Sequence, residues 1–93
     1  MKFTLTSKIR PVSGSRNDRR LDLKSDFSAE NLAEAVEKSK EIIMMMNMVH
    51  NHLVGYNHEA DLTMHTYHEQ LGCDVPRVVW KFHMKNGQMT MTS

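Results

Sequence analysis

The fold is decided by the stretch Val78-Val79-Trp80-Lys81-Phe82-His83-Met84-Lys85-Asn86-Gly87-Gln88-Met89-Thr90-Met91. Asn-Gly is the preferred pair for a two-residue type I′ turn, because both central residues of that turn need positive φ. The cross-strand pairs are then Lys85 with Gln88, Met84 with Met89, His83 with Thr90, and Phe82 with Met91. Apolar side chains meet apolar ones and polar meet polar, whereas a slip of one residue would send the methionines to the wrong face. The sequence therefore predicts a C-terminal hairpin with this register.

The N-terminal stretch also alternates with a period of two, which is typical of a half-buried strand. One side carries Phe3, Leu5, Ser7 and Ile9. Pro11 and the run Ser13-Gly14-Ser15-Arg16-Asn17-Asp18 interrupt the pattern, and alternation resumes with Leu21 and Leu23. We expect an N-terminal hairpin with a long loop.

A long helix is expected next. Ser28 suits the N-cap, and Phe27 and Leu32 have the spacing of a hydrophobic staple. An apolar stripe with a period of 3.6 residues follows and ends at Gly55. The stripe consists of Leu32, Ala35, Val36, Ile42, Ile43, Met46, Val49 and Leu53, with Ser39 completing the row.

Residues 57–71 fit two periodicities. Asn57 can cap a second helix, and one face of that helix would carry Ala60, Met64, Tyr67 and Leu71. The same segment can alternate as a strand through Leu62, Met64, Thr66 and His68. We favour the helix, with its C-terminal stop at Leu71-Gly72.

The predicted fold class is therefore α+β, as a single domain over residues 1–93. Two hairpins would form an antiparallel sheet of about four strands, packed on one long and one short helix in the order ββααββ. If Trp80 lies at the centre of the core, its replacement by Ala would cost about 3–5 kcal/mol of stability.

Composition excludes several classes of protein. The net charge of +1 does not suit a domain that coats nucleic acid or an acidic mimic of it. A single cysteine, Cys73, favours a reducing compartment. The N-terminus lacks an apolar run of signal-peptide length, and no stretch is apolar enough to cross a bilayer. We expect a cytoplasmic protein without a membrane partner.

Six histidines raise the question of a metal site. On a helix from Asn57, the side chains of His58, Asp61, His65 and His68 would share one face and could hold a divalent ion. The spacing matches no known signature, so a solvated polar face is the preferred interpretation and no metal ligand is assigned. Cys73 follows Gly72 without a pattern of a cysteine enzyme, and we interpret it as a loop residue.

Arginines cluster in the predicted loop of the N-terminal hairpin. Arg10, Arg16, Arg19 and Arg20 could bind phosphates or an acidic protein surface. No aromatic residue is interleaved to stack on bases, so a solvated loop is favoured and nucleic acid is the less favoured partner.

Methionines are the most unusual feature of the composition, with nine in 93 residues. Met44, Met45 and Met48 extend the outer, charged rows of the long helix, which therefore becomes apolar nearly all round. Either the second helix covers this helix end, or a partner protein or a second copy of the chain does. Methionine is flexible and polarisable, which suits an adaptable contact surface.

No nucleotide loop, catalytic triad, paired-carboxylate site or cysteine metal cluster is present in the sequence, so neither catalytic residues nor a cofactor are assigned. The sequence favours a non-catalytic protein-binding module that covers a partner's surface. Its partner-binding residues would be Met44, Met45 and Met48, with Arg16, Arg19 and Arg20 as a charged rim. Small chains of this kind are frequent among phage-encoded inhibitors of host enzymes or defence complexes. The alternatives are a nucleic-acid-binding regulator that uses the arginine loop and a histidine-based divalent-metal binder.

Overall fold

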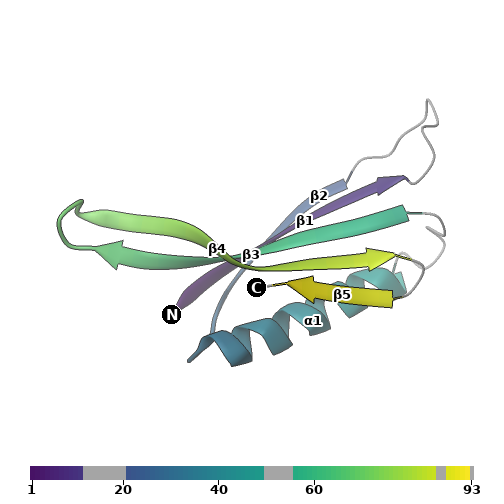
Figure 1. The fold of residues 1–93 in the computed structure, drawn as a ribbon, viewed down its shortest axis with the longest axis horizontal. Helices are drawn as coiled ribbons and strands as arrows, with labels where there is room; N and C mark the ends of the chain where they lie inside the picture. The colour runs from purple at the N-terminus through teal and green to yellow at the C-terminus, as the bar shows by residue number, and fades with distance from the viewer. Residues whose placement is uncertain (12–20, 50–55, 86–87, 93) are drawn as a thin grey trace.

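The computed structural model describes residues 1–11, 21–49, 56–85 and 88–92. Its elements in chain order are β1 (Lys2–Pro11), β2 (Leu21–Ser28), α1 (Leu32–Val49), β3 (Tyr56–His68), β4 (Cys73–Lys85) and β5 (Gln88–Thr92). The strands form one antiparallel sheet in the order β2-β1-β3-β4-β5. Helix α1 lies along one face of this sheet, and the molecule is elongated, at 47 × 25 × 20 Å (Figure 1).

The prediction of a second helix over residues 57–71, and with it the order ββααββ on a four-stranded sheet, is wrong. The segment forms strand β3 and the turn after it, so the described elements follow the order ββαβββ in a five-stranded sheet. β3 takes a central place, with β1 on one side and β4 on the other. Pairing on both sides satisfies its backbone groups and buries Ala60 and Leu62, whereas the predicted helix would have had only one face against the sheet.

The C-terminal hairpin has the predicted register. Lys85 pairs with Gln88, Met84 with Met89, His83 with Thr90, and Phe82 with Met91. Asn86 and Gly87, the predicted turn residues, lie outside the described residues. The position of the Asn-Gly pair and the matching of apolar and polar side chains across the strands together predicted this pairing.

The N-terminal hairpin is also confirmed, because β1 pairs with β2 from Lys2 and Ser28 to Ile9 and Leu21. Since Ser28 still pairs within the sheet, its prediction as the helix N-cap is wrong. Asn31 takes this role: its side-chain oxygen accepts a hydrogen bond of 2.8 Å from the backbone N–H of Glu34. The Glu34 carboxylate accepts from the backbone N–H of Glu30 and contacts Lys38, and these partners lower its pKa below the ordinary value.

The core lies between α1 and the sheet. Its most deeply buried large apolar side chains are Phe3 and Leu5 from β1, Ile43 from α1, and Leu62 from β3. Trp80 is only half-buried and lies at the margin of this cluster. The centre of the core is therefore the β1–β3 pair and not the C-terminal hairpin.

One small buried residue of β1 leaves a polar atom unpaired. Ser7 is fully buried, and its hydroxyl has no hydrogen-bond partner among the described residues. Burying an unpaired hydroxyl costs free energy that an alanine would not. Ser7→Ala should therefore raise the free energy of unfolding by about 1 kcal/mol, measured by urea denaturation.

Ser39→Ala is the matched comparison, because Ser39 is equally buried but donates a 2.7 Å hydrogen bond to the carbonyl of Ala35. Ser39→Ala should therefore raise the free energy of unfolding by less than Ser7→Ala does, or lower it. A loss of stability in Ser7→Ala would show that the Ser7 hydroxyl is satisfied in solution.

Candidate functional site

The far end of the β3–β4 hairpin forms a projecting arm, which we define as Thr66–Val78. Every residue of the arm is exposed. β1 pairs with β3 only as far as His65, and β5 pairs with β4 only from Lys81 onward. The arm therefore leaves the sheet as a two-stranded ribbon, which extends to the left in Figure 1.

A β-bulge lies at the base of the arm. Leu62 pairs with Trp80 but Thr63 pairs with Val78, so Val79 is the extra residue on β4. Bulges increase the local twist and redirect the strands beyond them. At the tip, Gly72 has a φ of +66° and its N–H donates to the carbonyl of His68 at 2.8 Å, which closes the turn.

The arm exposes large apolar side chains. Tyr67 is 62% exposed, Leu71 65% and Val78 47%, and Val75 is exposed as well. Pairing of His65 with Pro76 and of Tyr67 with Asp74 places Tyr67 and Pro76 on the same side of the ribbon. Within the described residues, no third strand or helix packs on this part of the hairpin.

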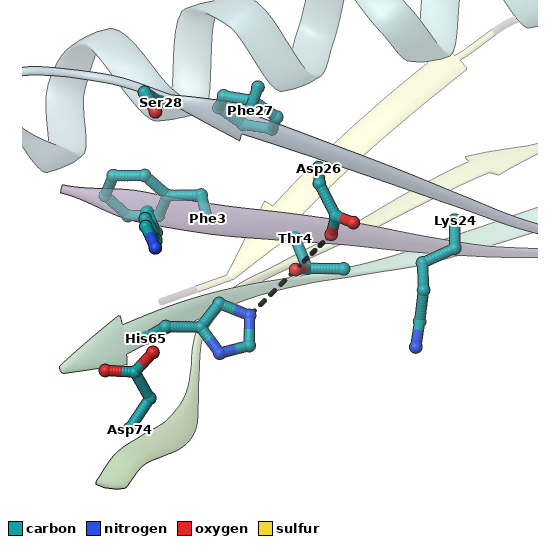
Figure 2. A pocket seen from close by; sticks show the side chains of 9 residues that line it. Phe3, Thr4, Lys24, Asp26, Phe27, Ser28, His65 and Asp74 are labelled. Atoms are coloured by element: carbon teal, nitrogen blue, oxygen red, sulfur yellow. Dashed lines mark hydrogen bonds between the residues drawn. The ribbon is translucent and has the colours of Figure 1, made fainter. Parts of the chain in front are cut away.

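A depression of about 560 Å³ lies beside the base of the arm, between the ends of β1, β2 and β3 (Figure 2). Its polar lining carries both signs of charge. The residues are Lys2, Lys24, Asp26, Ser28, His65 and Asp74, together with Thr4.

A hydrogen-bond chain crosses three strands at this depression. The hydroxyl of Thr4 lies 2.6 Å from Oδ1 of Asp26 and 2.7 Å from Nε2 of His65 (Figure 2). An ionised carboxylate only accepts hydrogen bonds, so the single Thr4 proton goes to Asp26 and Nε2 of His65 donates to the Thr4 oxygen. Because Thr4 is only 7% exposed and held from two sides, the chain joins β2, β1 and β3 and does not present a free nucleophile.

The sheet face opposite α1 is polar, and its charges alternate between strands. Lys8 lies between Asp22 on β2 and Glu59 on β3. In the next row, Asp61 pairs with Lys81 on β4. Opposite charges on neighbouring strands stabilise a sheet modestly, and this pattern offers no basic surface for a phosphate backbone.

Two of the methionines predicted as partner-binding residues have exposed side chains, at 50% for Met44 and 65% for Met45. We call this pair the methionine patch. Met46 is half-buried. Met48 belongs to α1, but its side chain lies outside the described residues, as do Arg16, Arg19 and Arg20 entirely. The structure thus brings no arginine rim to the methionine patch within the part that it describes.

Two other hypotheses from the sequence, the arginine cluster and the shared histidine face, involve residues that the structure describes. Arg10 forms an ion pair of 2.7 Å with Asp22, which joins β1 to β2. His65 and His68 lie on strand β3, where an odd spacing sends their side chains to opposite faces. The shared histidine face expected on a helix is therefore absent, and no group of three or more potential metal ligands occurs among the described residues.

The arm was missed because residues 57–71 were interpreted as a helix. One signal was available: Thr66 and Val75, both β-branched, lie on either side of the Gly72 turn at positions that pair in a hairpin. The Asp26–Thr4–His65 chain had no local signal, since its members are separated by 22 and 61 residues from Thr4.

No known protein family matches the chain, and no curated protein or solved structure is significantly similar to it. Among the described residues, no helix is both long and apolar enough to cross a membrane. The function is therefore inferred from the exposed surfaces themselves.

Proposed function

We propose that this chain is a non-catalytic protein-binding module that acts by covering part of a partner protein's surface. One observation supports this proposal above all: neighbouring large apolar side chains that the core does not use are exposed together in the methionine patch and in the arm. Contiguous exposed apolar surface on a small domain commonly marks a protein contact.

The methionine patch is suited to contact with a partner protein. The opposite side of α1 buries Ala35, Ser39 and Ile43 against the sheet, so Met44 and Met45 add nothing to the core. Flexible thioether side chains adapt to surfaces of different shape. Exposed charges of Glu37 and Glu41 lie on the same helix, giving the polar surroundings typical of an interface rim.

More specifically, we propose that the chain acts as phage-type inhibitors do, by covering a surface of a host enzyme or defence complex. A 93-residue chain with an exposed apolar patch on a helix needs no chemistry of its own to block a larger surface. Cys73 is free and exposed, which suits the reducing cytoplasm.

The test is an affinity capture from host lysate with the double variant Met44→Lys/Met45→Lys. Both side chains are exposed, and lysine is a good helix former, so the two substitutions should leave the fold intact. We expect the wild-type chain to capture a defined protein and the variant to lose it, with a loss of at least tenfold in affinity once the partner is purified.

Ala33→Lys, at an exposed position on the same helix, is the matched control and should keep the partner. Binding that survives the double variant would refute the methionine patch as the contact. Salt dependence separates the alternative function, because binding to a nucleic acid weakens steeply with ionic strength, whereas a methionine-anchored contact weakens little.

A further inference from the structure

The outer edge of β4 is open along the arm. β5 pairs with β4 only at Lys81–Lys85, so the residues from Cys73 to Trp80 have no strand on that side among the described elements. An open edge presents unpaired backbone donors and acceptors to any other extended strand. This segment includes Val75, Val78, Val79 and Trp80, which favour pairing in sheets.

The other edge of the sheet differs in its side chains. The edge strand β2 carries exposed charges at Asp22, Lys24 and Asp26, which is how proteins protect an edge from pairing. On β4, the free edge carries Asp74 and Arg77 as its only charges and Pro76, which withholds one N–H. The free edge of β4 is therefore only partly protected, because Val75 and Val78 remain exposed on it beside Pro76, the two charges and the bulge at Val79.

We infer that the arm is the interface of a homodimer, in which the free edge of β4 lies antiparallel to the same edge of a second copy. This inference rests on the proposed protein-binding function and assigns the arm, but not the methionine patch, to a copy of this chain.

Symmetry supports the second copy as the occupant. A strand related to its copy by a two-fold axis perpendicular to the sheet pairs antiparallel with it. Each copy therefore supplies the pairing strand that the open edge of the other copy lacks. The pairing would turn two isolated two-stranded ribbons, which are marginal in water, into one four-stranded sheet. Because the same surface is used twice, association stops at two copies.

The charges of the arm also fit a copy of itself. Glu69 and Asp74 are balanced in part by Arg77, and the whole chain has a net charge of only +1. Such a surface has no excess of one sign to attract a nucleic acid or an anionic membrane, and two copies do not repel each other strongly. Tyr67 and Pro76 of both copies would lie on the same face of the joined sheet, which extends the apolar contact.

The primary experiment measures the mass of the full chain by analytical ultracentrifugation over a dilution series. We expect a dimer at about 100 μM, a concentration well above a micromolar dissociation constant. Val75→Lys/Val78→Lys should be monomeric, with dimerisation weakened at least a hundredfold, because both side chains are exposed in the single chain and flank the centre of the paired edge. Circular dichroism should show that this variant is folded.

Met44→Lys/Met45→Lys is the control and should remain a dimer. A spin label on Cys73, the single cysteine of the chain, provides an independent measurement. Paired arms bring the two labels to one discrete separation within about 30 Å, since the eight free residues of β4 span less than that length.

A wild-type chain that is monomeric at the highest concentration, or an arm variant that still dimerises, would overturn the inference. The proposed function would be unaffected by either result if Met44→Lys/Met45→Lys still abolished capture of the partner. If Val75→Lys/Val78→Lys loses the dimer but still captures that partner, the result supports both the homodimer interface at the arm and the proposed protein-binding function.

Discussion

Leu62→Ala should lower the free energy of unfolding by about 2–5 kcal/mol. Leu62 is fully buried in the central strand β3, between Leu5 on β1 and Trp80 on β4. Truncation removes its apolar contacts and leaves a cavity that neighbouring backbone, held by strands on both sides, cannot collapse to fill. A domain of this size is stable by only about 5–15 kcal/mol, so the loss is a large fraction of the total. Urea denaturation followed by circular dichroism measures it.

Leu71→Ala is the matched control, because it deletes the same atoms from a side chain that is 65% exposed at the tip of the arm. At concentrations that keep the chain monomeric, its effect should stay within about 0.5 kcal/mol. Equal effects of the two substitutions would contradict the central place of β3 and would favour a core arranged around the C-terminal hairpin.

Both hairpins were predictable from the sequence for local reasons. In the C-terminal hairpin, the Asn-Gly pair sets the loop length, and Met89 and Met91 then match Met84 and Phe82 at only one register. In the N-terminal hairpin, the alternation of Phe3 and Leu5 revealed a strand. Its partner strand was also recognised, but the loop between them was too long to set the register, which left the pairing of Thr4 with Asp26 unknown.

Strand β3 was not predictable because its residues satisfy two periods at once. Ala60 and Met64 belong both to the apparent helical face and to the alternating face of the strand. The other members of that helical face, Tyr67 and Leu71, are exposed in the arm and therefore provide no burial to support either structure. The choice depends on the free edge of β1, to which β3 pairs along ten residue pairs, and this is a tertiary interaction.

The same dependence on strand register explains why the candidate site could be predicted only in part. Met44 and Met45 belong to a single helix, so their outward position followed from the helical period alone. The arm required knowing where β1 and β5 stop pairing with β3 and β4, which no local pattern contains. The start of α1 depends on strand pairing in the same way. Ser28 and Asn31 are both residue types that cap helices well, but Ser28 is still paired in the sheet, so Asn31 is the N-cap.

Thr4→Val should lower the free energy of unfolding by about 1–3 kcal/mol, although valine has nearly the same shape. The substitution keeps the packing of β1 but removes the hydroxyl that receives Nε2–H of His65 and donates to Asp26. Both partners then lose a hydrogen bond at the junction of three strands. In the nitrogen NMR spectrum of His65, we expect Nε2 to be the protonated nitrogen of the neutral ring in the wild-type chain and this preference to weaken in Thr4→Val.

Thr6→Val is the control for this substitution. Thr6 lies two residues further along the same face of β1 and is half-buried, but no side-chain hydrogen bond joins it to the residues that the structure describes. Because valine favours strands at least as well as threonine, Thr6→Val should be neutral or slightly stabilising. If Thr4→Val proved equally neutral and left the His65 signals unchanged, the Thr4 hydroxyl would be bonded to water in solution, and the Asp26–Thr4–His65 chain would not hold the base of the arm to the sheet.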